Sequence, residues 1–413
     1  MAEPSPPTGI RRGTPAYRKA NLAFFLSAFV TFASLYSVQP LLPIFAAEFG
    51  LGAGESSLSL SATTAVLAAA LILASWVSDR VGRRRLMVWS IVTTAALGLA
   101  LPFSPDWVSL VANRAVMGLT LSGLPAVAMV YLAEEMEPDA LGFSMGLYIG
   151  GTAIGGMAGR LLSGVLADWI SWRPALLALG IAIALAAIAV VLLLPQAHNS
   201  SPQRLSLTQL SRLIAVQFTD RGLPWLFASA FLLMGSFVTL YNYAGFRLAL
   251  PPFEISHAAI SSIFIVYLLG SVSSAWAGSL SQRLGRRRVY WVLVLVLAIG
   301  IGLTALPSTV GVIAGLAIAT IGYFAAHGIA SAWVTRRARQ GRAQASALYM
   351  FAYYLGASVL GTLGGYAWSA WDWPGVLLVS GGAILVALVI AVGLTRLPPL
   401  PIPEQRLEPP AGA

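Results

Sequence analysis

Three basic side chains stand inside long apolar stretches of the chain: Arg114, Arg160 and His327. If these stretches span a membrane, a charge within one costs at least about 2.5 kcal/mol, so it normally faces a cavity or a partner. Arg114 and Arg160 are therefore candidates for binding a polar or anionic group of a small molecule. His327 is a candidate proton carrier, because an imidazole titrates near neutral pH. The alternatives are an Arg114 that extends to the membrane surface, a buried structural pairing of Arg160, and a His327 that only packs and hydrogen-bonds.

Further aromatic and polar residues are candidates for lining the same cavity. An aromatic surface with a few polar groups suits an amphipathic small molecule, although each residue could also serve packing alone. The candidates are Tyr36, Gln39, Tyr241, Asn242 and Tyr353. No Asp or Glu stands at the centre of an apolar stretch. Such a cavity would be positive, which favours a neutral or anionic, partly apolar substrate over a cation.

The sequence excludes several kinds of chemistry. It has no cysteine, so disulfides, thiol catalysis and thiolate metal sites are ruled out. It also has no phosphate-binding loop of the kind that would power transport with ATP, and no nucleophile–base pair or cluster of metal ligands. We therefore expect no enzyme activity, no cofactor and no metal.

The composition is that of a membrane protein. The chain has 413 residues, of which 58% are hydrophobic and only 10% charged, whereas soluble domains carry about 25% charged residues. A spanning helix needs about 20 mostly apolar residues. We predict twelve spans, over residues 21–45, 56–77, 86–103, 107–133, 141–167, 174–194, 223–248, 255–280, 289–306, 310–334, 343–368 and 375–394. A soluble helical protein would need nearly every helix buried on all sides.

The positive charges predict the orientation in the membrane. The net charge is +10, and all 25 Lys and Arg except Arg114, Arg160, Arg173 and Arg247 lie in the tails, the central linker and alternate short loops. This is the positive-inside bias, which places both termini in the cytoplasm and indicates a lipid bilayer, not nucleic acid, as the partner. The first apolar run is too long for a signal-peptide core, so we take it as an uncleaved first span.

The chain is predicted to consist of two similar halves. The charged loop 79–85 recurs 203 positions later as 282–288, and features of residues 147–172 recur 201 positions later in 348–373. Parallel repeats of six helices are a known transporter design. We predict a cytoplasmic tail (1–20), a six-helix bundle (21–194), a cytoplasmic linker (195–222), a second six-helix bundle (223–394) and a Pro-rich cytoplasmic tail (395–413). The amphipathic part of the linker, 205–218, is expected on the membrane face or against the bundle.

The loop between the second and third spans resembles the signature of the major facilitator superfamily, G-x-x-x-D-R-x-G-R-R. Residues 75–84 read S-W-V-S-D-R-V-G-R-R, with Ser75 in place of the first Gly, and the second copy has Gly278 but Gln282 in place of Asp. The resemblance covers essentially the whole chain and implies an all-helical, twelve-span major facilitator fold. It also implies a conformational latch that closes the cytoplasmic side, whereas a pure topology anchor is the alternative. The latch residues would be Asp79, Arg80, Gly82, Arg83, Arg84, Arg283, Gly285, Arg286 and Arg287.

The fifth span resembles the proton-antiporter subgroup of that family. The subgroup has Gly, eight residues and then Gly-Pro-x-x-Gly-Gly, and this chain has Gly142 followed by Gly151, Gly155 and Gly156, with Thr152 in place of Pro. Arg114, followed by glycines in the fourth span, is similar to that subgroup's buried basic residue. The span also has two stripes of glycines at a spacing of four, which are expected to let two neighbouring helices approach closely. One stripe is Gly142, Gly146 and Gly150, and the other is Gly151, Gly155 and Gly159.

Together these features predict a secondary active transporter of the cytoplasmic membrane that works as a monomer by rocking of its halves. The resemblance implies proton-coupled efflux of small amphipathic compounds. The alternative is an importer or facilitator of an organic anion or a sugar-like metabolite, with Arg114 and Arg160 on the anionic group. A sensor on the same fold would be expected to carry a soluble output domain, and none is present.

Overall fold

The computed structural model describes residues 9–197 and 206–397. Within them the fold is entirely helical, apart from one isolated bridge between Ile10 and Met136. The predicted Pro-rich tail lies almost wholly outside the described residues.

Among the described residues, the first half has nine α-helices and two short 3-10 helices. They are α1 (Pro15–Tyr36), η1 (Gln39–Leu41), α2 (Leu42–Phe49), α3 (Ala53–Ser56), α4 (Leu58–Val81), α5 (Arg83–Ala100), η2 (Leu101–Phe103), α6 (Trp107–Leu121), α7 (Pro125–Glu135), α8 (Pro138–Ile170) and α9 (Trp172–Leu193). The remaining elements are α10 (Leu207–Ala215), η3 (Val216–Thr219), α11 (Leu223–Ala249), α12 (His257–Ser262), η4 (Ile263–Val266), α13 (Tyr267–Leu284), α14 (Arg286–Leu303), α15 (Thr309–Arg337) and α16 (Arg342–Leu394).

Several of these helices are long and apolar enough to cross a membrane. The described residues hold eight such helical segments and two shorter apolar helices, Leu58–Ala74 and Trp107–Leu121. The longest, α16, leaves helical geometry at Trp371 and Asp372, so it consists of two helices joined at a kink. The multi-pass membrane architecture is thus clear, and the count of twelve spans stays a prediction.

Prolines break two of the spans predicted as single helices. In the first span α1 ends at Tyr36, and the chain continues through η1 and α2, which contain Pro40 and Pro43. Proline interrupts a helix because it has no N–H to donate. The prediction of one continuous helix over 107–133 is wrong, since α6 ends at Leu121 and α7 starts at Pro125.

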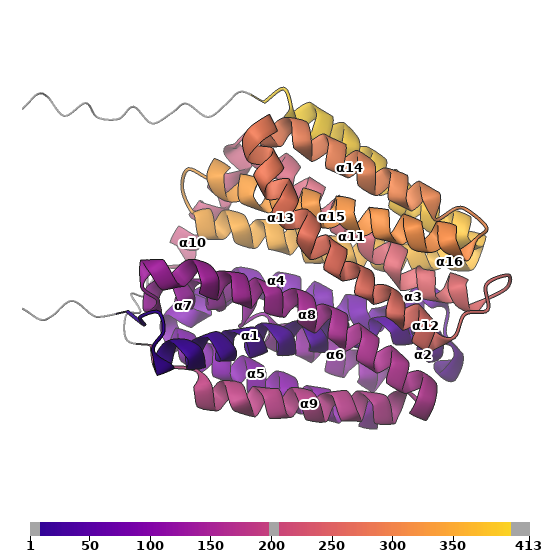
Figure 1. The fold of residues 1–413 in the computed structure, drawn as a ribbon, viewed down its shortest axis with the longest axis horizontal. Helices are drawn as coiled ribbons and strands as arrows, with labels where there is room; N and C mark the ends of the chain where they lie inside the picture. The colour runs from indigo at the N-terminus through magenta and orange to yellow at the C-terminus, as the bar shows by residue number, and fades with distance from the viewer. Residues whose placement is uncertain (1–8, 198–205, 398–413) are drawn as a thin grey trace, which may run out of the picture.

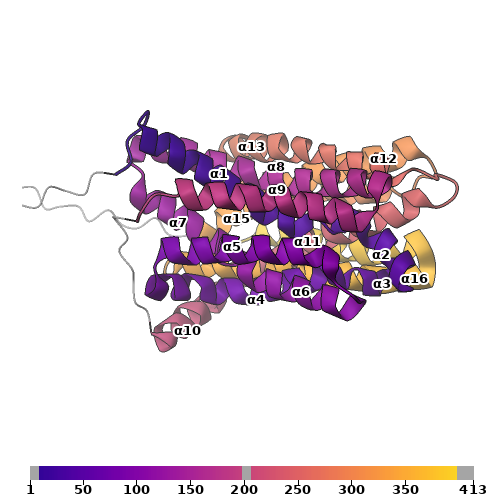
Figure 2. The ribbon, with the colours of Figure 1, turned by 90° about the horizontal axis from the view of Figure 1, so that it is seen from below.

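The two halves form two bundles that lie side by side along their length. Figure 1 shows α1–α9 in one bundle and α11–α16 in the other, with α7 and α10 at one end and α2, α3 and α12 at the opposite end. Figure 2 shows the same two ends after a quarter turn. We call the first the arginine end, since loops 79–85 and 282–288 lie there, and the second the far end. The linker helix α10 packs on the second bundle, where Gln217 of η3 donates to the Gln340 carbonyl over 2.8 Å.

Hydrogen bonds join the bundles from their middle to the far end. Ser358 of α16 donates to the Ser61 carbonyl of α4 over 2.9 Å. At the far end itself, the Asp168 carboxylate of α8 accepts from the backbone N–H of Ala258 in α12 over 3.2 Å. These contacts hold the bundles together toward the far end.

Candidate transport cavity

A cavity of about 550 Å³ lies between the bundles, on the arginine-end side of these contacts. Residues of α1, α8, α11, α13, α15 and α16 line it. Its walls are largely aromatic: Phe32, Tyr36, Phe237, Tyr267, Tyr323, Phe324, Tyr353 and Tyr354. Arg160 and His327 also line it, and of the described residues that do so none is acidic.

Arg160 is the charged centre of this cavity. Its side chain is only 3% exposed. Its Nε donates to Gln39 Oε1 over 2.5 Å, and its Nη1 donates to the Gly156 carbonyl over 2.7 Å. The guanidinium carbon lies 3.7 Å from the ring centre of Tyr36 and 4.7 Å from that of Tyr267, which adds cation–π attraction. No ion pair joins Arg160 to a carboxylate of the described chain.

Gln39 and Asn242 stand behind Arg160 and do not line the cavity. Gln39 sits in η1, and its Nε2 donates to Asn242 Oδ1 of α11 over 2.7 Å. The two residues therefore orient the arginine and join the bundles in one chain of hydrogen bonds. Both partners are neutral, so the charge of Arg160 is not compensated by them.

Glycines of α8 bring the backbone of this helix onto α1. A Cβ atom at Gly151, Gly155 or Gly159 would lie 2.4 to 2.6 Å from a backbone oxygen of α1. Gly156 serves Arg160 instead, because a Cβ there would lie 3.2 Å from its Nη1. This glycine face therefore fixes where Arg160 enters the cavity.

The second glycine stripe does not pack as expected. A Cβ at Gly142, Gly146 or Gly150 would meet nothing within 4 Å. Gly146 and Gly150 line the cavity. The prediction of a second close helix contact is thus wrong for this structure, because that face of α8 looks onto the space between the bundles.

Arg114 lies away from the cavity. It is fully buried, and it donates to the carbonyls of Leu35 over 2.6 Å, Ser34 over 2.9 Å and Ser59 over 2.8 Å. Ser34 and Leu35 are in the last turn of α1, whose carbonyls have no partner within the helix. A cation there is also favoured by the helix dipole. The expectation that Arg114 contacts substrate or extends outward is corrected: it caps the broken first span.

His327 lies in the cavity wall and contacts both Tyr353 of the wall and Tyr349, which does not line the cavity. Its Nδ1 is 2.9 Å from the Tyr349 hydroxyl, and its ring centre is 4.8 Å from that of Tyr353. The Tyr353 hydroxyl accepts from Tyr323 over 2.7 Å. Tyr241 is not in the wall but behind it, with its hydroxyl 2.6 Å from Thr320 Oγ1.

Sequence reasoning missed most of the aromatic wall of the second bundle. Phe237, Tyr267 and Phe324 reach the cavity from three different helices. Only Tyr323 and Phe324 could have been predicted to line the cavity. They stand four and three residues before His327, and that spacing places residues on one helical face. The other rings are common in membrane helices and give no such signal.

Arg83 of the loop 79–85 forms ion pairs within the first bundle. Arg83 Nη2 lies 2.6 Å from Glu134 of α7 and 3.7 Å from Asp79. Burial raises the pKa of Asp79, and the charges of Arg83 and Arg80 act against that shift. Arg84 donates to the Leu194 carbonyl over 3.2 Å. A latch between the bundles stays a prediction.

Both loops turn at a glycine with positive φ, +96° at Gly82 and +85° at Gly285. Only glycine adopts this conformation without strain. The backbone of the charged loop is therefore the same in both halves, although Asp79 is replaced by Gln282.

Comparison with known proteins agrees with this architecture. The family model of the Major Facilitator Superfamily matches residues 24–251 and 232–413. The chain belongs to the major facilitator superfamily. It is 42% identical over 387 residues to the inner membrane transport protein YnfM of Escherichia coli, covering 94% of this chain and 93% of that relative. It is 40% identical to the uncharacterized MFS-type transporter YybF of Bacillus subtilis, over 97% of this chain and 99% of the relative.

The fold of this superfamily member matches solved transporters. A bacterial homolog of the human lysosomal transporter Spinster, solved in an inward-facing and occupied conformation, superposes with a TM-score of 0.72. That match is 15% identical and covers 93% of this chain and 97% of the other. The family model and the relatives together identify the protein as a membrane transporter of the major facilitator type.

Proposed function

We propose that this transporter carries small, partly apolar organic anions out of the cell in exchange for protons. The observation that carries the proposal is Arg160, a buried guanidinium in an aromatic cavity with no carboxylate among the described lining residues. Burying an unpaired charge is costly, and an anionic substrate offsets that cost. A cationic substrate would increase it.

The aromatic walls indicate the shape and polarity of the rest of the substrate molecule. Rings from five helices line the cavity, and the Arg160 guanidinium lies over the rings of Tyr36 and Tyr267. A flat apolar body fits against such walls, while a carboxylate or sulfonate accepts from the guanidinium edge. The volume of about 550 Å³ suits a compound of one or two rings.

Alternating access supplies the movement. The bundles are joined toward the far end, and the cavity lies on the arginine-end side. From the positive-inside bias we take the arginine end as cytoplasmic, and this state would then load substrate from the cytoplasm. Closing the arginine end and separating the far end would then release substrate outside.

His327 is our candidate for the proton carrier. It is in the cavity wall, and an imidazole is a side chain that can take up and release a proton. Tyr349 hydrogen-bonds one ring nitrogen. Proton entry at His327 would alternate with anion binding at Arg160 across the same cavity.

Import of an organic anion is the second candidate function, since Arg160 would serve both directions. The test is accumulation in whole cells of labelled aromatic carboxylates, each paired with its uncharged amide and with an amine analogue. Export predicts lower accumulation of the carboxylates alone on expression, reversed by a protonophore. Raised accumulation of one carboxylate would establish import instead. Equal handling of amine and carboxylate would overturn the anion proposal.

Proton exchange is tested separately in everted vesicles that report the internal pH. Adding a transported carboxylate to wild-type vesicles is expected to move protons opposite to the anion. The His327→Gln variant should still bind substrate but move no protons. Proton movement at the wild-type rate in that variant would remove His327 from the pathway.

A further inference from the structure

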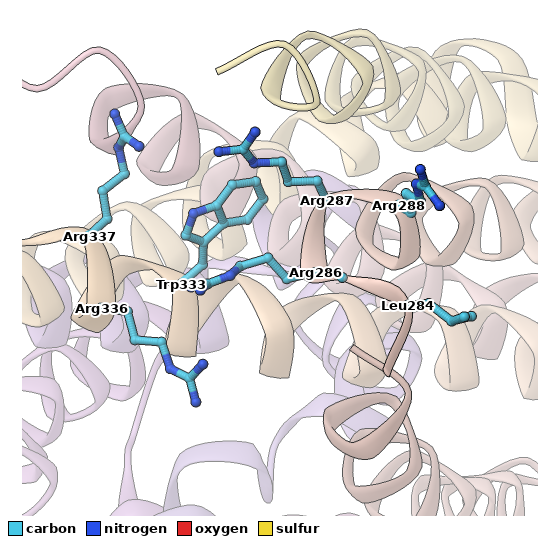
Figure 3. A pocket seen from close by; sticks show the side chains of 8 residues that line it. Leu284, Arg286, Arg287, Arg288, Trp333, Arg336 and Arg337 are labelled. Atoms are coloured by element: carbon cyan, nitrogen blue, oxygen red, sulfur yellow. The ribbon is translucent and has the colours of Figure 1, made fainter. Parts of the chain in front are cut away.

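A second cavity, of about 440 Å³, lies at the arginine end of the second bundle. It is formed by the start of α14 and the end of α15, and it is separate from the transport cavity. Its charged and aromatic lining is Arg286, Arg287, Arg288, Trp333, Arg336 and Arg337. Figure 3 shows Arg286 and Arg287 extending from α14 toward Trp333, while Arg336 and Arg337 leave α15 on opposite sides.

The first half builds the same place from opposite charges. Arg83, the repeat counterpart of Arg286, forms a 2.6 Å ion pair with Glu134 at the end of α7. Glu134 lies between the loop with a repeat offset of 203 and the segment with an offset of 201. At an offset of 202, Glu134 corresponds to Arg336 and Tyr131 to Trp333. The second half therefore has an arginine where the first has the carboxylate that neutralises the loop.

The described part of the second half offers little to replace that carboxylate. Its one ion pair at this end joins Arg337 to Asp220 over 2.5 Å. Arg286, Arg287, Arg288 and Arg336 have no ion pair with a described residue. Burial, together with the like charges of Arg336 and Arg287, lowers the pKa of Arg286.

The backbone adds to this positive field. Arg286–Arg288 form the first turn of α14, and Gly285, as its N-cap, provides no side chain to cap it. The N-terminal turn of a helix carries partial positive charge and free N–H groups, and it favours an anion. Three arginines in that turn are unfavourable until an anion joins them.

We propose that this cavity binds a phosphate group, either of free phosphate or of a phospholipid headgroup, in the place that the Glu134 carboxylate takes in the first half. Guanidinium groups hold phosphate oxygens in pairs, with charge on both partners. The bound phosphate connects the α13–α14 loop to the end of α15. It thus does for the second half what the Arg83–Glu134 pair does for the first. The proposal is independent of the transported substrate.

The test uses the full chain in nanodiscs and measures its unfolding temperature. In phosphatidylcholine discs, inorganic phosphate is titrated against chloride at equal ionic strength. In a second arm, phosphatidylglycerol replaces part of the phosphatidylcholine. A rise with inorganic phosphate identifies a free anion, and a rise with phosphatidylglycerol alone identifies a lipid headgroup. No rise in either arm overturns the proposal.

Variants separate a built site from general attraction. Arg336→Glu restores the charge arrangement of the first half, so it should be stable without the anion, and its response to phosphate or phosphatidylglycerol should be about 10-fold weaker. Arg288→Gln, at an exposed position, should weaken the response without affecting folding. The matched control is Arg85→Gln, the exposed counterpart in the first half, which should respond as wild type. An equal loss in Arg85→Gln, or an unchanged response in both Arg336→Glu and Arg288→Gln, would contradict the site.

Discussion

Two arginines of the first bundle are almost equally buried, yet they do different things. Arg114 is 0% exposed and Arg160 is 3% exposed. The donors of Arg114 go to backbone carbonyls of two other helices and to the sulfur of Met117 in its own helix. Those of Arg160 go to one amide side chain and to a carbonyl of its own helix, and its face looks into an aromatic cavity.

The difference shows that burial of a charged side chain does not by itself reveal whether the charge serves the fold or a bound substrate. Arg114 stabilises the fold, since it donates hydrogen bonds to carbonyls at the end of α1 that have no partner within the helix. No carboxylate of the described protein neutralises the charge of Arg160, and we propose that an anionic substrate does so. The kind of partner, not the burial, separates the two roles.

The largest effect is expected for Arg114→Met. The change removes the guanidinium from three buried carbonyls. Ser34 and Ser59 keep hydroxyl donors in Ser37 and Thr63, so the penalty of about 1–3 kcal/mol for an unsatisfied group falls mainly on Leu35. The unfolding temperature and the yield of folded protein should fall sharply, while the remaining folded protein binds substrate with nearly wild-type affinity. Thermal unfolding in detergent and equilibrium binding measure the two quantities. Arg114→Lys is the control, since it keeps a buried donor; selective loss of binding in Arg114→Met would return Arg114 to the site.

The second effect is that of Arg160→Gln on transport. A hydrogen bond to a charged group contributes about 1.5–3 kcal/mol, so anion affinity should fall by about 10- to 100-fold. The unfolding temperature should change little or rise, because an uncompensated charge is removed. Binding of a labelled carboxylate and initial transport rates measure this. Wild-type rates would exclude Arg160 from the site.

These two residues also show where sequence reasoning succeeds. Hydropathy and the repeated arginine loops are local signals, so the membrane class, the repeat and the family could be predicted. The burial of Arg114 and Arg160 could be predicted too. The role of Arg114 could not, because it depends on carbonyls of Ser34 and Leu35 that only the break after Tyr36 makes available.

The same limit applies to the cavity wall. His327 stood out as an ionisable residue in an apolar stretch, but its partner Tyr349 comes from another helix. Gly146 and Gly155 looked alike in sequence, yet one faces the cavity and the other the backbone of α1. Such distinctions depend on which helices become neighbours, and no single stretch of sequence contains that information.

A smaller effect is expected for Gln39→Glu, which sharpens the comparison by giving Arg160 a carboxylate partner. The glutamate would take the position 2.5 Å from Arg160 Nε and neutralise it. Anion affinity should fall by about 10-fold, comparable to one charged hydrogen bond, and uncharged amides should gain relative to carboxylates. A substrate competition series measures that shift. Asn242→Asp, one residue further from the arginine, is the control and should shift the preference less.

The smallest effect is that of Gly156→Ala. Its new Cβ would lie 3.2 Å from Arg160 Nη1, so the guanidinium must move by a few tenths of an ångström. A displacement of this size should weaken anion binding by about 2- to 5-fold and leave stability nearly unchanged, because the neighbour is a side chain and not a backbone. Gly146→Ala is the matched control, on the same helix and in the same cavity, with nothing within 4 Å of the added atom. If both variants weaken binding equally, the cavity responds to bulk alone; a loss confined to Gly156→Ala shows that affinity depends on the position of the Arg160 charge.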